Sequence, residues 1–405
     1  MSGSVSRIAL LIVVTACLAD RPASPGAFVL DDVGTGRWRS VSTGAEHTCA
    51  IDDHAQAWCW GSNASFQLGV TQTASQCGSP AVACSVVPVK VATGRTFVAI
   101  SAGRSHTCAL ATDSVPFCWG SNSDGQLGVG GSATAELQIP GTAPMRSISA
   151  GATHSCGVRG DNQLVCWGSN RFGAVGAGVG KGVPPTLVGG SARFTTVAAT
   201  DERSCARTTT GRIMCWGAMW TETRGDTNFT SIRDTPGFVS GLGVMSAVSV
   251  GPNSACSLDS TGFVWCWESN LFGEQGTGPG PGSIAARRIA SDEEFISVSV
   301  GDHYACGATI DGVGYCWGSN RDLQIGAITT EYCTFARTRC TTRPVRVSGK
   351  QRFSTVSAGL GGHVCGVTDQ YNLYCWGAGS FGQRGDGTTT SISRVPRLAA
   401  AVAGQ

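Results

Sequence analysis

The strongest constraint on this chain is a motif of two cysteines separated by nine residues, with a tryptophan directly after the second cysteine. The motif occurs seven times, about every 50 residues, and this regularity predicts one structural unit repeated seven times. The predicted pairs are Cys49 with Cys59, Cys108 with Cys118, Cys156 with Cys166, Cys205 with Cys215, Cys256 with Cys266, Cys306 with Cys316 and Cys365 with Cys375. The tryptophans that follow them are Trp60, Trp119, Trp167, Trp216, Trp267, Trp317 and Trp376.

The remaining cysteines predict two further disulfides and one unpaired residue. Cys77 and Cys84 are separated by six residues, as are Cys333 and Cys340, and Cys17 is left over. A zinc site requires closely spaced cysteines, which this chain lacks, whereas pairs at fixed spacing are typical of disulfides formed in an oxidising compartment. We therefore predict an extracytoplasmic protein with nine disulfides.

The N-terminus favours the same compartment. A short apolar run, Ile8 to Ala16, follows Arg7 and has the length of a signal-peptide core rather than a bilayer span. The end of this run resembles a bacterial lipobox, in which Cys17 becomes the lipidated first residue. We predict a signal peptide over 1–16, a lipid-anchored tether over 17–36 and the folded domain over 37–405. The expected location is the bacterial outer membrane or cell surface, and the alternative is ordinary secretion with Cys17 discarded.

Each repeat has the pattern of short strands joined by turns. The nine-residue gap places the two cysteines of a pair on the arms of one β-hairpin, directly opposite each other and within disulfide reach. Such a staple should contribute about 2–3 kcal/mol in the chain-entropy model. The tryptophan beside the second cysteine points to the other face of the strand. We therefore expect each tryptophan to meet the disulfide of the neighbouring unit.

A fourth strand follows each hairpin, and proline within several of these segments indicates an edge position. Seven units of four antiparallel strands predict an all-β fold, a seven-bladed β-propeller with one hairpin disulfide per blade. The simplest ring closure lets Val395–Leu398 complete the blade that begins near Trp38. A competing closure uses Phe28–Leu30.

The repeat resembles that of the regulator of chromosome condensation family, a family of seven-bladed propellers. The residues that carry the resemblance are Gly44–Thr48, Gly103–Thr107, Gly151–Ser155 and Trp119–Gly128, and the likeness extends over about residues 38–398. Copy four departs from the pattern with Arg203 in place of histidine, and copy five departs with Ser254 and Glu268. The paired cysteines look like an extracytoplasmic bacterial branch.

The resemblance implies several functions, because this fold hosts different activities. The family's best-known activity is nucleotide exchange on a small nuclear GTPase, which the disulfides and the signal peptide argue against. The formal net charge of +2, without a basic run, argues against nucleic acid. No catalytic motif is present, and we predict no cofactor and no metal. We predict a non-catalytic, monomeric binding propeller with a protein or glycan partner. The alternatives are a propeller enzyme acting on glycans, which a carboxylate or histidine cluster at the ring's centre would favour, and a nucleotide-exchange regulator.

Histidines recur at one position of the repeat, and three tryptophans lie outside the repeated tryptophan position. His47, His106, His154 and His363 occupy one repeat position, and the favoured interpretation is structural rather than a metal-binding or proton-relay ring. Trp58, Trp220 and Trp265 lie outside the repeated tryptophan position, so we consider them as partner contacts.

Two inserted loops are the sharpest indication of a binding site. Residues 70–86 and 327–343 extend the same connection in copies one and six, which flank copy seven in a ring. Each contains one of the short-spaced cysteine pairs, and a stapled loop loses less entropy on binding. We predict a partner site on this face with four contacts: Gln76, Tyr332, Phe335 and Arg337. In the alternative interpretation, the disulfides only rigidify exposed loops.

Overall fold

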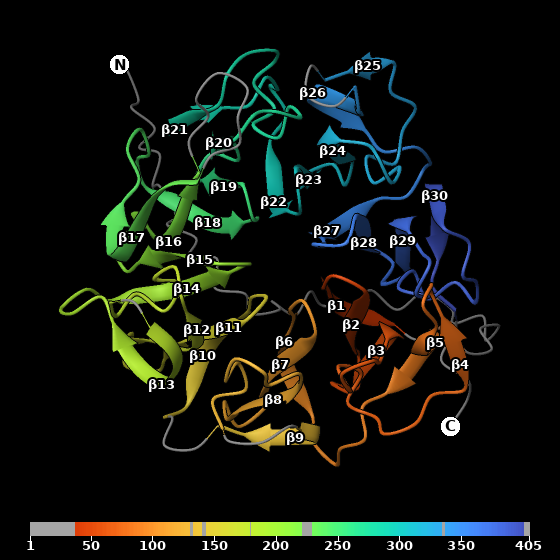
Figure 1. Cartoon of the computed structure of the whole chain (residues 1–405). Coiled ribbons are helices and arrows are strands. Elements are labelled where there is room, and N and C mark those ends of the chain that lie inside the picture. The colour runs from red at the N-terminus through yellow and green to blue at the C-terminus, as the bar shows by residue number, and fades with distance from the viewer. Residues whose placement is uncertain are drawn as a thin grey trace, which may run out of the picture. The chain divides into compact units, whose positions relative to one another are not determined.

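The computed structural model describes residues 37–129, 133–139, 143–178, 180–220, 229–333 and 337–400. The chain divides into two units, Met1–Val33 and Gly34–Gln405, and all described residues belong to the second. That unit consists of seven antiparallel sheets arranged as blades around a central axis (Figure 1). Within these ranges no helix has the length and apolar character needed to cross a bilayer. The predicted fold class, a seven-bladed propeller, is confirmed.

Each blade contains four strands in chain order from the axis outward, and blades one and six carry a fifth strand at the rim. The innermost strands are β1 (Trp38–Thr43), β6 (Phe97–Ala102), β10 (Met145–Ala150), β14 (Phe194–Ala199), β18 (Met245–Val250), β22 (Phe295–Val300) and β27 (Phe353–Ala358). The second strands are β2 (His47–Asp52), β7 (His106–Ala111), β11 (His154–Arg159), β15 (Arg203–Thr208), β19 (Ser254–Asp259), β23 (Tyr304–Thr309) and β28 (His363–Thr368).

The outer half of each blade contains the third and fourth strands. The third strands are β3 (Ala57–Ser62), β8 (Pro116–Gly120), β12 (Leu164–Asn170), β16 (Ile213–Trp220), β20 (Val264–Glu268), β24 (Gly314–Ser319) and β29 (Leu373–Ala378). The fourth strands are β5 (Val82–Lys90), β9 (Ala133–Gln138), β13 (Gly180–Val188), β17 (Phe229–Phe238), β21 (Ser283–Arg288), β26 (Arg339–Arg346) and β30 (Ile392–Leu398). The additional rim strands are β4 (Ser75–Cys77) and β25 (Glu331–Tyr332).

All nine predicted disulfides are present, seven in hairpins and two in loops. The hairpin bonds join Cys49 to Cys59, Cys108 to Cys118, Cys156 to Cys166, Cys205 to Cys215, Cys256 to Cys266, Cys306 to Cys316 and Cys365 to Cys375. The loop bonds join Cys77 to Cys84 and Cys333 to Cys340, with Cα atoms 5.8 Å apart in each.

The hairpin bonds have the predicted geometry. In each of the seven hairpins the two cysteines are direct partners in the register of the second and third strands. Their Cα atoms lie 4.0–4.1 Å apart. Each hairpin bond therefore staples its own blade, as the nine-residue spacing predicts.

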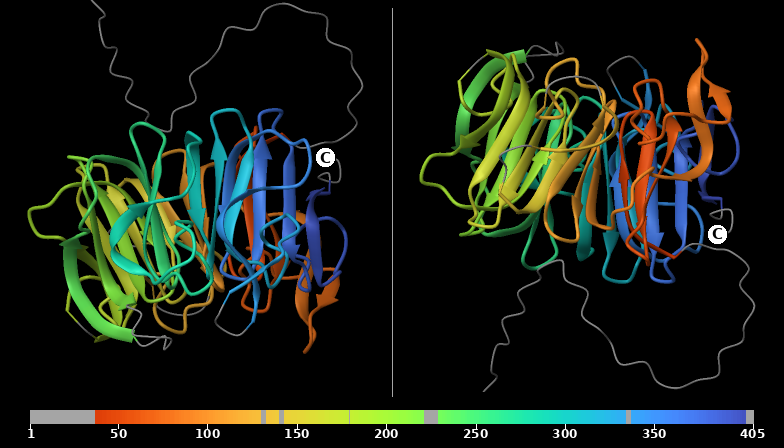
Figure 2. Two further views of the ribbon diagram at one scale, coloured as in Figure 1. Left: turned by 90° about the horizontal axis from the view of Figure 1, so that it is seen from above. Right: turned by 90° about the horizontal axis from the view of Figure 1, so that it is seen from below.

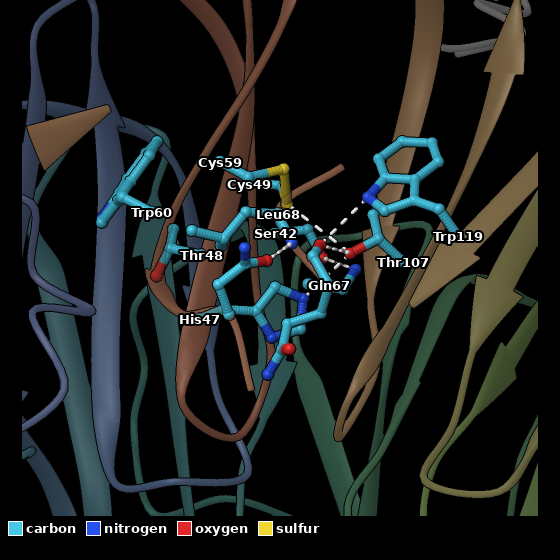
Figure 3. The surroundings of a disulfide bond; sticks show 12 residues. Ser42, His47, Thr48, Cys49, Cys59, Trp60, Gln67, Leu68, Thr107 and Trp119 are labelled. Carbon is cyan, nitrogen blue, oxygen red and sulfur yellow. Dashed lines mark hydrogen bonds between the residues drawn. A yellow bond between two sulfur atoms is a disulfide. The ribbon is translucent and has the colours of Figure 1, made fainter. Parts of the chain in front are cut away.

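The core lies between blades, in layers of the predicted composition. The Cys49–Cys59 disulfide of blade one belongs to the same buried cluster as Trp119 of blade two, and Trp60 points the other way toward blade seven (Figure 3). The same pairing of a disulfide with the next blade's tryptophan recurs in every one of the seven interfaces. Alternation along a strand thus places the two residues of the Cys-Trp pair in different interfaces.

The predicted closure of the ring through a shared blade is wrong. Strand β30, which contains Val395–Leu398, pairs with β29 and completes blade seven. Blade one uses only strands from residue 38 onward, and Phe28–Leu30 lies outside the described residues. The ring closes by packing instead: Trp60 Nε1 donates to the carbonyl of Gln383 at 2.9 Å, in a cluster that includes the Cys365–Cys375 disulfide.

Candidate binding face

The strands run along the ring's axis, so their connections lie at its two ends (Figure 2). Because neighbouring strands of a blade are antiparallel, the described connections after its first and third strands lie at the same end of the ring, which we call the loop-rich face. The first-to-second connections bond to one another around the axis, for example from Ala45 N to Gly103 O and from Leu360 N to Gly44 O. Glycine is required here, because a Cβ on Gly44 would come within 2.3 Å of the Gly103 oxygen.

Charged side chains from separate blades converge at the centre of this face. Arg104 of blade two donates to Asp201 of blade four at 2.6 Å, a contact that bypasses blade three. Asp302, from blade six, lies close enough that its charge acts on Arg104 and that the charge of Asp201 acts on its own carboxyl group. Short connections beside the innermost strands make this convergence possible. We call the following residues the axial cluster: Glu46, Arg104, Asp201, Glu202, Asp302 and His303.

The axial cluster continues outward through a carboxylate that replaces a repeat glutamine. Glu274 is fully buried and accepts hydrogen bonds from Ser269 Oγ at 2.7 Å and from the Phe272 backbone N–H at 2.7 Å. Its other contact is His303, whose Nδ1 lies 3.2 Å from Glu274 Oε1. Burial lowers the pKa of His303, but the hydrogen bond and charge of Glu274, together with the charge of Asp302, outweigh burial and raise the pKa above its ordinary value. The cationic form of His303 is therefore favoured.

Several carboxyl groups of the axial cluster hold their protons more tightly than usual. Burial raises the pKa of Glu46 and of Glu202, and neighbouring arginines oppose the rise. Burial also raises the pKa of Asp302, which the charge of His303 opposes and that of Asp201 reinforces. This cluster was not predicted, although charged residues within two positions of the repeat glycine in copies one, two and six were a visible signal.

The repeat-position histidines belong to blade packing, as predicted, although each bonds to the next blade rather than to its own backbone. His47 Nε2 lies 2.9 Å from the Thr107 hydroxyl, which donates to the carbonyl of Gln67 at 2.9 Å (Figure 3). Because the Thr107 hydroxyl donates its proton to Gln67, its oxygen can only accept from His47, so Nε2 must be the protonated ring nitrogen. His106, His154 and His363 make the equivalent bonds to Ser155, Ser204 and Thr48.

The histidine and the hydroxyl disappear together in the other three blades. Blades four, five and six carry Arg203, Ser254 and Tyr304 at the histidine position. The blades that follow them carry Ala255, Ala305 and Val364 where a hydroxyl would stand. Neither half of the link persists without the other, which indicates that the pair acts as one packing unit.

The stapled loops lie at the rim of blades one and six, on either side of blade seven (Figure 1). The predicted contacts Gln76 and Arg337 are exposed, and Tyr332 is 61% exposed. Phe335 and the predicted lipid-attachment residue Cys17 lie outside the described residues. The predicted partner contacts therefore remain accessible where they can be described.

Each stapled loop packs against the preceding blade. The blade-one loop contacts blade seven, where Gly387 N donates to Val86 O at 2.9 Å. The blade-six loop instead contacts blade five, where Gly278 N donates to Thr342 O at 2.9 Å. The two loops thus extend the same connection of their blades, as predicted. Only the blade-one loop contacts blade seven, because each loop packs against the blade that precedes its own.

The tryptophans outside the repeat position do not serve as exposed anchors where they can be described. Trp58 is 8% exposed and donates through Nε1 to Asp52 at 2.8 Å. Trp265 makes the same bond to Asp259 at 2.9 Å and packs against a core cluster. The side chain of Trp220 lies outside the description. The interpretation of Trp58 and Trp265 as partner contacts was wrong, because an aspartate at each hairpin turn holds the indole against the blade.

Among the described residues, Asp52, Asp53 and His54 are the one group with potential metal ligands within 4.8 Å of each other. Asp52 already accepts bonds from His54 N, Gln56 N and Trp58 Nε1. Its carboxylate therefore organises the blade-one hairpin turn, and the group offers no assembled ligand set.

A ring of seven antiparallel blades, each with its own hairpin disulfide, defines the class of seven-bladed β-propellers. Models of the regulator of chromosome condensation (RCC1) repeat match residues 38–67, 97–126 and 145–174, and a second model matches 55–110 and 117–158. Residues 38–174 thus carry RCC1 repeats, within a ring of seven blades.

Known proteins share the repeat or the fold. The ultraviolet-B receptor UVR8 of Arabidopsis thaliana is 34% identical over 92 residues, which cover 23% of this chain and 19% of that protein. The probable E3 ubiquitin-protein ligase HERC6 of Homo sapiens is 33% identical over 90 residues, 22% of this chain and 8% of the ligase. Both matches thus span under a fifth of the relative's length.

Solved structures resemble the whole ring at low identity. Prp20p of Saccharomyces cerevisiae, described with its binding to Gsp1p and histones, superimposes with a TM-score of 0.72 at 19% identity and covers 90% of this chain and 87% of its own. Human WBSCR16 gives a TM-score of 0.68 at 19% identity over 80% of this chain and 86% of its own. This likeness establishes the fold.

Proposed function

We propose that the protein is an extracytoplasmic binding propeller, anchored to the bacterial cell envelope through Cys17, that recognises a protein partner with its loop-rich face. The observation that carries the proposal is the blade-six stapled loop: Tyr332 is 61% exposed on a two-residue rim strand that a disulfide ties to a rigid blade. Binding residues concentrate on loops positioned by rigid scaffolds, and a stapled loop loses less entropy on binding.

The extracytoplasmic location is supported by the disulfides. Every hairpin cysteine is 0% exposed, so each bond is built into a blade interface rather than added at the surface. Such bonds form and persist in oxidising compartments. Thiol counting on protein from its native host should find no free thiol in the propeller, and mass analysis of the N-terminus should find a lipidated Cys17. Free propeller cysteines would contradict the location.

A protein partner is supported by the kind of molecule that related propellers engage. Prp20p is described with Gsp1p and histones, and another solved structure shows Prp20 bound to Kap60. The open blade-six loop offers an aromatic side chain of the type enriched at interface hot spots.

A matched pair of tyrosine variants tests the face. Cross-linking capture from the cell envelope should recover a specific partner with the native protein, and Tyr332→Ala should weaken capture at least tenfold. The control is Tyr371→Ala, because Tyr371 is 37% exposed at the blade-seven hairpin turn, at the opposite end of the ring. If both variants weaken capture equally, or if neither weakens it, the partner does not bind at the loop-rich face.

The axial cluster favours a second candidate, an enzyme acting on glycans. Carboxyl groups with raised pKa values are suited to general acid catalysis, and Asp302 lies beside both His303 and other carboxylates. Hydrolysis of a panel of envelope polysaccharides that is abolished by Asp302→Asn, with an unchanged melting temperature, would support it. Equal product release by both proteins would eliminate it.

A further inference from the structure

The end of the ring opposite the loop-rich face carries an excess of positive charge. It is formed by the turns between the second and third strands and by the segments that lead into each first strand. We call these segments, with the two strand residues on either side of them, the hairpin-turn face. Five exposed arginines of blades one to four lie there, and we call them the basic sector: Arg37, Arg39, Arg146, Arg193 and Arg212.

The other charges of the hairpin-turn face balance one another. In blades one to four, four carboxylates are matched in number by four further cations: Asp52, Asp53, Asp113 and Asp161 against Lys90, Arg95, Arg159 and Arg207. In blades five to seven, six cations from Arg287 to Arg397 face six carboxylates from Asp259 to Asp369. Among the described side chains this face therefore has a net charge of +5, which is the charge of the basic sector.

The contacts that hold these arginines leave their charge uncancelled. The guanidinium of Arg37 lies 4.5 Å from the centre of the Tyr371 ring. Arg146 donates to the carbonyl of Gly160 at 2.8 Å, and Arg193 donates to two carbonyls of its own connection at 3.1 Å. An aromatic ring or a carbonyl positions a guanidinium without neutralising it, so its remaining N–H groups can bind an anion.

The polypeptide enters the ring at this same face. Asp53 N donates to Arg37 O at 2.8 Å, and Trp38 N donates to Tyr371 O at 2.9 Å, so blade one begins between two hairpin turns. Cys17 precedes Arg37 by 20 residues, which span at most about 70 Å when fully extended. An anchor at Cys17 therefore attaches the ring to a membrane by its hairpin-turn face.

We propose that the basic sector binds the anionic headgroups of that membrane, so that the hairpin-turn face lies on the bilayer and the loop-rich face points away from it. The choice of a bilayer rests on the proposed function, which includes the anchor at Cys17. Val98 and Val244, 61% and 60% exposed on the hairpin-turn face, add apolar side chains suited to the interfacial region. Each arginine near an anionic surface increases affinity about fivefold.

Vesicle binding by the full chain carrying Cys17→Ser, which cannot be acylated, tests the surface directly. Vesicles of phosphatidylglycerol and phosphatidylethanolamine should bind at least tenfold more strongly than neutral phosphatidylcholine vesicles. The neutral vesicles measure the background from the apolar run Ile8 to Ala16. The excess should decline as salt is raised from about 50 to about 300 mM, because ions screen the attraction between exposed charges.

A matched pair of triple variants locates the charge that binds. Reversal of three arginines of the basic sector should lower the affinity for the anionic vesicles at least tenfold: Arg39→Glu/Arg146→Glu/Arg193→Glu. The control changes the net charge equally at three exposed arginines of the loop-rich face and should retain the excess: Arg171→Glu/Arg321→Glu/Arg339→Glu. Thermal melting verifies that both fold, and glutamine at the same positions replaces glutamate where a reversal prevents folding.

Chemical footprinting of the lipidated protein, purified from its host and reconstituted in the same anionic vesicles, tests the orientation. An arginine-specific dicarbonyl reagent should modify the three control arginines as fully as it does in detergent. Modification of Arg39, Arg146 and Arg193 should fall at least fivefold. Equal modification of the two sets, or protection of the control set, would overturn the proposed orientation.

Equal binding of anionic and neutral vesicles, or equal effects of the two triple variants, would overturn the surface. Binding of duplex DNA or polyglutamate through these arginines, without vesicle binding, would overturn it in favour of a soluble polyanion. A lipidated Cys17 without the vesicle excess would remove the surface and leave the proposed function intact. An unmodified Cys17 together with the vesicle excess would instead remove the anchor and support the surface.

Discussion

Arg203 of blade four and Glu268 of blade five form an ion pair across the interface between their blades, and both side chains are 1% exposed. Arg203 replaces the repeat histidine, and Glu268 replaces a glycine that the other six blades retain. Glu268 keeps the left-handed backbone of that glycine, with φ of 79°. Burial raises the pKa of Glu268 to about 7, against the attraction of Arg203. The two departures from the repeat thus compensate each other, because each buried charge has the other as its partner.

Removing one member of this pair should be more harmful than removing both. Arg203→Ala leaves a buried carboxylate without its partner and should lower the free energy of unfolding by about 3–5 kcal/mol. Arg203→His/Ala255→Ser/Glu268→Gly restores the residue types of other blades, including the hydroxyl opposite the histidine, and should stay within about 1 kcal/mol of the native protein, because exchanging a whole buried pair is often nearly neutral. Denaturant unfolding with the disulfides intact measures both, and equal losses would contradict the compensation.

The hydroxyl between His47 and the Gln67 carbonyl should stabilise the interface of blades one and two. Thr107→Val conserves shape but leaves two buried polar groups with fewer partners, at a cost of about 1–3 kcal/mol. Thr107→Ser retains the hydroxyl and should lose clearly less. Thermal melting of the two variants provides the comparison, and the link has no energetic role if valine and serine behave alike.

Acidification should destabilise the ring through its buried histidines. Burial lowers the pKa of His47, His106 and His363 to about 3 and that of His154 to about 4. The unfolded chain takes up these protons near pH 6.5, so their contribution to stability is complete above that pH. It declines as pH falls toward 4, by up to about 1.4 kcal/mol per unit for each histidine.

A glutamine variant isolates this effect. His106→Gln cannot titrate, so its unfolding free energy should depend less steeply on pH between 6.5 and 4 than that of the native protein. Denaturant titrations at several pH values measure the slope. An unchanged slope would mean that His106 is protonated in the folded ring.

The hairpin disulfides should matter more for stability than the loop disulfides. Removing the bond between Cys108 and Cys118, by replacing both with alanine, removes a staple and also the apolar surface on which Trp167 packs. We therefore expect a loss above the roughly 2–3 kcal/mol of loop entropy. Cys77→Ala/Cys84→Ala affects a rim loop and should lower the melting temperature less. Similar losses in the two variants would indicate that the tryptophan layer adds nothing to the staple.

Local pattern predicted most of the fold. Cys49 and Cys59 are opposed, and Trp60 faces the other interface, because hairpin pairing and strand alternation depend only on neighbours in the chain. Ring closure was predicted wrongly, since an unpaired C-terminal strand and a complete seventh blade have the same local signature. The candidate site was predicted in part: Tyr332 is exposed as expected, but the axial cluster was missed.

The sequence by itself determined the number of blades, the disulfide pairing and the residue types of each blade interface, because these depend on short-range patterns that occur seven times. Only the tertiary structure decided which of the residues that depart from the repeat contact one another. Arg104 reaches Asp201 because the ring's curvature brings alternate blades together at the axis. Arg203 faces Glu268, and Phe272 turns to His303, because adjacent blades pack in one rotational sense. Such contacts join residues distant in the chain, and their partners follow from the geometry of closure.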